Sequence, residues 1–299
     1  MKNLLLALLL VAGSAQAAPP RVVVVQSDDL APYVEPVPAF LTALGEPAIV
    51  INLHGQRSEA EALATRLKQQ DPKVVFALGA KAAWAVKQAL PHTPLLYASV
   101  LEPERYGLEG SQVTGVEMTV SSDTYLSQYV GFFPEHKRIG LLRGPSTSDE
   151  QLAEVQAAAD ASEVTLVVRS VTGPREVRRV ASELAPLVDA LWLRPDRAIL
   201  TRDTFRGVVE ETRRRRVPLL VETDNMVRAG GMFAVVPSAE GLGEQVAAMA
   251  RRIADGAAPA VIPVEAPDRV LVVLNTRAVD ASNVSFDRLL LDFVDVVVE

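Results

Sequence analysis

Short apolar runs, rich in valine, isoleucine and leucine, alternate with amphipathic stretches along most of the chain. Runs of this length, bounded by turn residues, are typical of strands buried on both faces of a sheet. In the first half, the predicted strands cover residues 21–26, 48–53, 74–78 and 95–99. In the second half, they cover residues 138–142, 164–168, 190–193 and 218–221.

The stretches between these runs carry apolar residues at helical spacing. Two capping boxes, Ser58 with Glu61 and Ser148 with Gln151, predict helix starts. Pro38 stands where the first turn of another helix is expected. Further predicted helices cover residues 177–184, 205–214 and 242–254. Strands that alternate with helices indicate a parallel sheet with right-handed crossovers.

The strand–helix pattern restarts at residue 138, which predicts an α/β fold with two doubly wound parallel-sheet lobes of similar size. Residues 119–136 are expected to join the two sheets. The helix at 242–254, a strand at 269–274 and a strand-like end at 293–298 are interpreted as returns to the earlier lobes. The expected lobes are residues 18–118 plus about 237–262, and residues 119–236 plus about 263–299.

The first residues have the features of a secretory signal peptide. Lys2 precedes an apolar run at residues 4–11, and small residues end in Ala15-Gln16-Ala17, so residues 1–17 are expected to be removed. The chain has no cysteine, which excludes lipid attachment at a cleavage-site cysteine, disulfides and thiolate metal ligands. The expected location is therefore the periplasm, as a secreted, soluble protein that is not a lipoprotein.

Composition removes several function classes. The formal net charge of −7 argues against a nucleic-acid partner. His54, His92 and His136 are far apart in sequence and are expected at the surface rather than around zinc. The sequence contains neither a G-x-S-x-G elbow nor a Walker A motif, so we predict no catalytic residues, no cofactor and no metal. Trp84 and Trp192 are expected in the core.

Polar turns follow the predicted strands, and the carboxyl ends of parallel strands are where ligands bind in open α/β sheets. The Gly79 turn is followed by a helix, whose first N–H groups suit an anion. In the first lobe, the turns carry Ser27, Asp28, Asp29, Gly79, Ala80, Lys81, Val100 and Glu102. In the second lobe, they carry Arg143, Ser146, Thr147, Arg194, Asp196, Glu222 and Asn225. This mixture of cationic, acidic and hydroxyl or amide groups suits a zwitterion held between the lobes.

Several short motifs occur together in an order that resembles a known family. They cover residues 75–83, 94–103, 113–116, 137–142, 188–193, 241–245 and 256–260. In this order they resemble the ABC-transporter substrate-binding proteins whose better-known members take up tryptophan and related amino acids. That family has the type I periplasmic-binding-protein fold.

The resemblance implies that two lobes close on a small, amino-acid-like ligand and dock to an ABC permease. The turn Gly79-Ala80-Lys81 matches the family's ligand-binding helix start, although Ala80-Lys81 replaces the more usual hydroxyl residue. An early His-Pro pair of the family is also absent, and residues 28–32 stand in its place.

The leading interpretation is a non-enzymatic, monomeric solute-binding protein for uptake. An alternative is a periplasmic sensor that binds a ligand and docks to a membrane receptor or kinase. An exported hydrolase is a third reading, which no motif favours. A LacI-type regulator has the same fold, but the predicted signal peptide and the missing DNA-binding helices argue against it.

Overall fold

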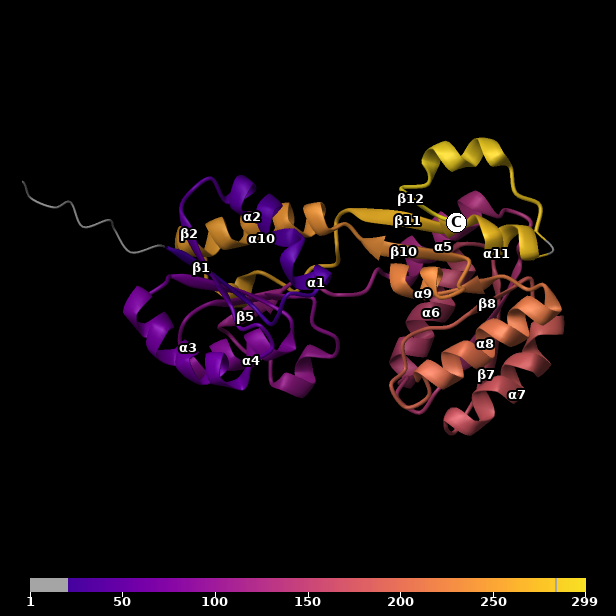
Figure 1. The fold of residues 1–299 in the computed structure, drawn as a ribbon, viewed down its shortest axis with the longest axis horizontal. Coiled ribbons are helices and arrows are strands. Elements are labelled where there is room, and N and C mark those ends of the chain that lie inside the picture. Colours follow the sequence, from indigo (N-terminus) through magenta and orange to yellow (C-terminus); the bar gives the residue numbers. More distant parts are fainter. Residues whose placement is uncertain (1–20, 283) are drawn as a thin grey trace, which may run out of the picture.

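A computed structural model describes residues 21–282 and 284–299, so the predicted signal peptide lies outside the described residues. Two α/β lobes lie beside each other (Figure 1). The first has a five-stranded sheet in the order β2-β1-β3-β4-β5, with every pair parallel. Its strands are β1 (Val22–Gln26), β2 (Ala48–Asn52), β3 (Val74–Leu78), β4 (Leu95–Ala98) and β5 (Val113–Gly115).

Helices cover both faces of this sheet. One face packs against α2 (Pro36–Leu44) and the late helix α10 (Ala239–Ala254), and the other against α3 (Arg57–Gln70) and α4 (Ala80–Ala89). The α2–α10 contact is close because Gly243 has no side chain: a Cβ there would lie 2.3 Å from the Pro36 carbonyl oxygen. Three short elements complete the lobe: α1 (Ala31–Val34), η1 (Pro103–Tyr106) and η3 (Pro259–Val261).

The second lobe has a seven-stranded sheet in the order β12-β11-β10-β9-β8-β6-β7. Within it, β7-β6-β8-β9-β10 repeats the order of the first sheet, and β11 and β12 extend one edge. The strands are β6 (Arg138–Arg143), β7 (Thr165–Ser170), β8 (Ala190–Trp192), β9 (Leu219–Leu220), β10 (Phe233–Pro237), β11 (Val270–Asn275) and β12 (Val296–Val298).

Two apolar clusters fill the faces of the second sheet. One gathers aromatic side chains, including Tyr125, Tyr129, Trp192 and Phe233, and the other is mostly aliphatic. The helices are α5 (Ser122–Phe132), α6 (Asp149–Ala161), α7 (Pro174–Leu184), η2 (Ala185–Leu187), α8 (Arg202–Arg215), α9 (Asp224–Arg228), α11 (Thr276–Ala281) and η4 (Arg288–Phe293). Of the helices formed by the described residues, none has the length and apolar character needed to cross a membrane.

The fold class is confirmed, and so is the cap at Ser148, whose hydroxyl accepts from Gln151 N while Gln151 Oε1 accepts from Ser148 N. The Ser58–Glu61 capping box is wrong. The helix already begins at Arg57, with Gln56 as its N-cap and no side-chain cap bond, so Ser58 lies within the first turn.

Four further expectations from the sequence need correction. The strand at 48–53 is not buried on both faces, because β2 is an edge strand and Val50 is exposed. Residues 119–136 are not merely a connection, because α5 lies within them and supplies core residues. The sheets are not wholly parallel, since β11 runs antiparallel to β10. Only Val296–Val298 of the stretch 293–298 form a strand.

The chain crosses between the sheets three times: after β5, before α10 and after η3. Two of these crossings pair with each other, because Glu117 N donates to Glu265 O (2.9 Å) and Glu265 N donates to Gly115 O (3.0 Å). These crossings connect the lobes along one side, and the carboxyl ends of β4 and β8 approach each other across the space between them, where Glu102 meets Arg197.

Candidate functional site

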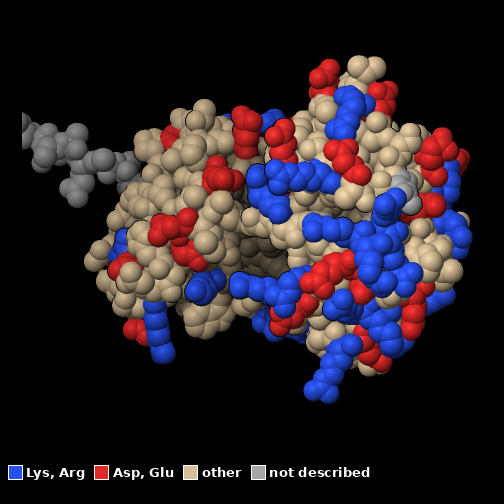
Figure 2. Space-filling view, turned by 45° about the vertical axis from the view of Figure 1, so that its right-hand side comes forward, with Lys and Arg blue, Asp and Glu red and all other residues tan. Residues whose placement is uncertain are grey.

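The carboxyl ends of β1 and β3 form one wall of the space between the lobes. In the order β2-β1-β3-β4-β5, the chain leaves β1 and β3 toward opposite faces of the sheet, which leaves a crevice at these ends. An open hollow of about 500 Å³ lies there. Its lining consists of Ser27, Asp28, Tyr33, Ala80, Lys81, Trp84 and Tyr106. Figure 2 shows the surface hollowed between the two lobes, with basic side chains around the opening.

The β3–α4 turn forms the floor of this hollow. Gly79 has φ +89°, and Ala82 N donates to Ser27 Oγ (3.0 Å), so Ser27 satisfies one of the first N–H groups of α4. Within the described residues, no acceptor is found for the N–H groups of Ala80 and Lys81. A Cβ on Gly79 would lie 2.5 Å from Ser27 Oγ and 2.6 Å from Tyr33 Cε1. Gly79 therefore permits packing beneath the hollow, and its Cα does not face a ligand directly.

Three aromatic side chains form the wall: Tyr33, Trp84 and Tyr106. Trp84 is 51% exposed and lines the hollow, so the expectation that it lies in the core is wrong. Trp192 is in the core as predicted, stacked on Tyr125 with ring centroids 4.7 Å apart. Burial, together with the charge of Asp28, raises the pKa of the Tyr33 hydroxyl.

The two adjacent aspartates after β1 have different surroundings. Asp28 lines the hollow and accepts a bond from Leu30 N through Oδ1 (2.8 Å). Asp29 turns toward the end of β2, where it accepts from Asn52 Nδ2 (2.7 Å) and pairs with His54 Nδ1 (2.9 Å). Only Asp28 is therefore available to a ligand in the hollow.

The turn after β4 contributes less to the hollow than its sequence suggested. Val100 is buried in the core of the first lobe and does not line the hollow. Glu102 Oε2 lies 3.1 Å from Arg105 Nη1 and 3.3 Å from Arg197 Nη1, and Arg197 belongs to the second lobe. The carboxylate of Glu102 is therefore already held by two guanidinium groups.

In the second lobe, Asp196 joins two neighbouring turns. It is 4% exposed, its Oδ2 accepts from Ser146 N and Thr147 Oγ1 (both 3.1 Å), and its Oδ1 accepts from Ala198 N (2.9 Å). Arg143 stays within the same turn, donating to the Thr147 carbonyl and pairing with Asp149. These four predicted site residues, Arg143, Ser146, Thr147 and Asp196, come together as a network that shapes the edge of the second lobe.

Arg194 lies at the end of β8, between a buried carboxylate and an aromatic ring. Its Nε is 3.1 Å from Glu222 Oε1, and its guanidinium carbon lies 5.2 Å from the centre of the Trp192 ring. The Glu222 side chain is only 4% exposed. Burial raises the pKa of Glu222, and the charge and hydrogen bond of Arg194 oppose that shift. This pair fixes one edge of the guanidinium and leaves the other edge partly exposed.

The sequence predicts the turns at the strand ends but not the aromatic side chains that line the hollow. Asn225 is exposed in the first turn of α9, away from the contacts above. His136, expected at the surface, is buried and bonded to Tyr129 through Nδ1. No sequence motif marks Tyr33, Tyr106 or Arg197. Trp84 could have been placed from sequence, because it lies five residues after Gly79, about one and a half turns into the helix.

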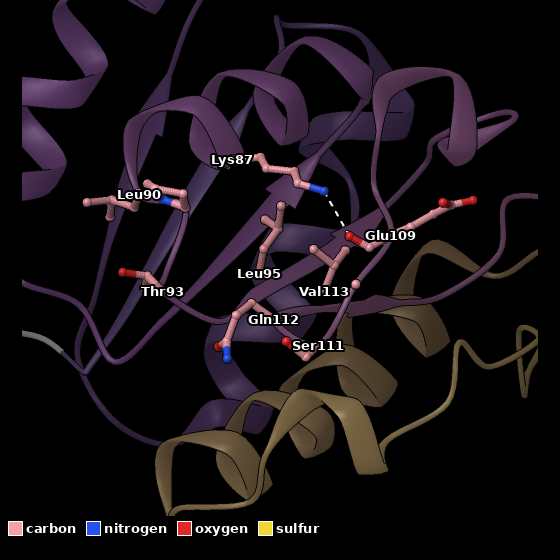
Figure 3. Close-up of a pocket in the computed structure, with 10 residues that line it drawn as sticks. Lys87, Leu90, Thr93, Leu95, Glu109, Ser111, Gln112 and Val113 are labelled. Atoms are coloured by element: carbon pink, nitrogen blue, oxygen red, sulfur yellow. Dashed lines mark hydrogen bonds between the residues drawn. The ribbon is translucent and has the colours of Figure 1, made fainter.

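A second hollow, of about 190 Å³, lies at the amino ends of β4 and β5, opposite the edge that carries Ser27 and Gly79 (Figure 3). Lys87 Nζ donates there to the carbonyls of Gly107 and Glu109, so its ammonium group holds the loop that lines the pocket.

Among the residues that the structure describes, no group of three or more histidine, aspartate or glutamate side chains is arranged to hold a metal ion.

Solved structures with the same fold include several binding proteins. A ligand-free, open substrate-binding protein with adhesive properties from Clostridium difficile matches with a TM-score of 0.72 at 20% identity, covering 89% of this chain and 96% of its own. An ABC domain from Streptococcus pneumonia in complex with L-Trp matches with a TM-score of 0.61 at 22% identity, covering 93% and 99%. No curated protein sequence matches the chain.

These likenesses support the type I periplasmic-binding-protein fold that the sequence motifs implied. The family model described as ABC transporter substrate binding protein matches residues 48–297, which take in most of both lobes. The chain therefore belongs to the ABC transporter substrate-binding protein family.

Proposed function

We propose that the protein captures a small, amino-acid-like ligand between its lobes and delivers it to an ABC permease in the membrane. The observation that carries this proposal is the 500 Å³ hollow at the β1 and β3 ends, which combines aromatic walls with the Lys81 ammonium group and the Asp28 carboxylate. A ligand carboxylate is held by the N–H groups of Ala80 and Lys81 and by the Lys81 ammonium group. The ligand side chain lies against Trp84 and Tyr106.

The ligand's ammonium group then has one partner. Glu102 and Glu222 are paired with arginines, and Asp196 is saturated by its three donors. Asp28 Oδ2 has no hydrogen-bond donor within the described residues, so Asp28 is the carboxylate that accepts from the ammonium. The L-Trp in the pneumococcal structure supports a ligand of this kind.

The second lobe completes the site by closure. Arg194 presents the free edge of its guanidinium group, and a ligand that contacts both lobes only when they are close shifts the population toward closure. The ligand-bound form is the one that docks to the permease. The protein acts without catalysis or cofactor, as a soluble periplasmic monomer released by cleavage after residue 17 and carrying no lipid.

Mass spectrometry of small molecules released from protein purified under native conditions identifies the ligand. Calorimetric titration then compares the wild type with Lys81→Ala, Asp28→Asn and the control Lys68→Ala, which removes an exposed lysine of α3. Loss of one charge-assisted bond should weaken binding by about ten- to a hundredfold. The control should bind as the wild type does.

Wild-type affinity in both Lys81→Ala and Asp28→Asn would place the ligand elsewhere. Release of no small molecule, together with no binding of any of the twenty amino acids, would refute the amino-acid-like ligand.

A further inference from the structure

One ion pair joins the lobes across the opening of the cleft, away from the three chain crossings. Arg197 follows β8 in the second lobe, and its Nη1 lies 3.3 Å from Glu102 Oε2, which follows β4 in the first. Arg105 Nη1 of the first lobe approaches the same oxygen at 3.1 Å. Glu102 therefore takes part in one contact within its lobe and one between lobes, through a single atom.

The loop that carries Glu102 has an uncommon backbone. Ser99 (φ 56°) and Glu102 (φ 51°) both have left-handed conformations, which cost non-glycine residues energy and persist only where surrounding contacts hold them. Ser99 Oγ donates to the Pro32 carbonyl (2.9 Å), and Arg105 N donates to the Glu102 carbonyl (3.1 Å). Pro103 also disfavours a right-handed helical conformation at Glu102. The carboxylate is thus aimed by a fixed loop.

The same loop reaches the hollow. Tyr106, at the end of the short helix that begins with Pro103, lines the wall beside Trp84. Contacts of residues 99–106 therefore extend from the candidate ligand site to Arg197. Tyr106 is thus connected to the Glu102 carboxylate through a single turn of helix.

We propose that Glu102 is a positioning residue that holds the second lobe through Arg197 in the ligand-free protein, and that the loop 99–106 couples occupation of the hollow to this contact. The proposal rests on the two-lobe capture proposed above. Arg197 is 52% exposed and Glu102 is 29% exposed, so the pair is of the weak, salt-sensitive kind. Its removal should change the ratio of lobe arrangements by about two- to fivefold.

The test needs no ligand. Because the chain has no cysteine, Lys68→Cys on α3 and Ala153→Cys on α6 provide the only two thiols, one in each lobe, for spin labels. Double electron–electron resonance then gives the distribution of distances between lobes. Arg197→Gln should broaden this distribution toward longer distances. In labelled protein that keeps Arg197 and Glu102, about 1 M salt should have the same effect, because it screens the attraction between the two charges.

Arg105→Gln is the matched control, because it removes a guanidinium group from the same Glu102 oxygen without touching the second lobe. It should leave the distribution unchanged, and Glu102→Gln combined with Arg197→Gln should equal either single variant. An unchanged distribution in Arg197→Gln, or the same change in Arg105→Gln, overturns the proposal. Because these measurements use ligand-free protein, they stand whether or not an amino acid binds. Coupling is then tested by adding a saturating amino-acid ligand, which should shorten the distances less in Arg197→Gln than in protein that keeps Arg197.

Discussion

Replacement of Gly79 by alanine tests whether the floor of the hollow is as closely packed as its geometry indicates. The backbone there has φ +89° and ψ 158°, a region that is nearly restricted to glycine and costs other residues about 1–3 kcal/mol. The added methyl group would also lie within 2.6 Å of Ser27 Oγ and Tyr33 Cε1, and overpacking of this kind costs about 1–3 kcal/mol more. Together these effects predict a loss of about 2–6 kcal/mol in the free energy of unfolding.

Gly110→Ala separates the two effects. Gly110 also has positive φ (+112°), but an added Cβ there would meet nothing within 4 Å, so only the backbone cost applies. Urea denaturation followed by circular dichroism measures both variants, with the slope of the transition checked for constancy. We expect Gly79→Ala to lose more than Gly110→Ala, and to bind ligand more weakly because Ser27 and Tyr33 must move. Equal losses in the two variants would show that the contacts beneath Gly79 are loose, contrary to the argument.

Four further outcomes follow from individual side chains of the cleft and of the second lobe. Trp84→Ala should change the free energy of unfolding by less than about 0.5 kcal/mol, because the ring is half exposed, yet weaken ligand binding in calorimetry by tenfold or more. Arg194→Gln should cost about 3–5 kcal/mol, because Glu222 is left buried without its partner. Since burial raises the pKa of Glu222, the folded state binds its proton more tightly, so stability should fall as pH rises from about 4.3 toward the raised folded pKa, and Glu222→Gln should remove this slope in denaturation curves. Burial lowers the pKa of His136, so stability should instead fall as pH decreases from about 6.5 toward the lowered folded pKa, a trend absent from His136→Phe.

Much of the first half of the site was predictable because it depends on local sequence. A buried run followed by Ser27-Asp28, and another followed by Gly79-Ala80-Lys81, place those residues at adjacent strand ends in any parallel sheet of this order. The alternation of strands and helices predicts parallel strands in both sheets but not the order of the strands. Local periodicity therefore predicts which edge of each sheet can bind.

What failed depends on contacts between distant residues. Asp196 stays a predicted site residue, but its Oδ2 accepts from Ser146 N and Thr147 Oγ1, and its own stretch of sequence does not predict these contacts. Trp84 lies on a helix whose buried residues, Ala82, Ala83, Ala85 and Val86, pack on the sheet, and its ring instead lines the hollow that Tyr33 and Tyr106 help to form. His136 has a polar side chain, yet it is buried in the core, where its Nδ1 is hydrogen-bonded to the Tyr129 hydroxyl. The chemistry of a side chain alone does not show whether it lies in the core or lines the cleft.

The packing of α10 on α2 has a consequence for the order in which the molecule can assemble. Leu242, Val246 and Ala250 of this late helix belong to the same apolar cluster as Phe40 and Phe76, so α2 covers this face of the first sheet only in part until residue 254 has been synthesised. By then five of the second sheet's seven strands, β6 to β10, have also been made. The first lobe therefore completes its native packing only after α10 has been synthesised, although its last strand, β5, ends at Gly115.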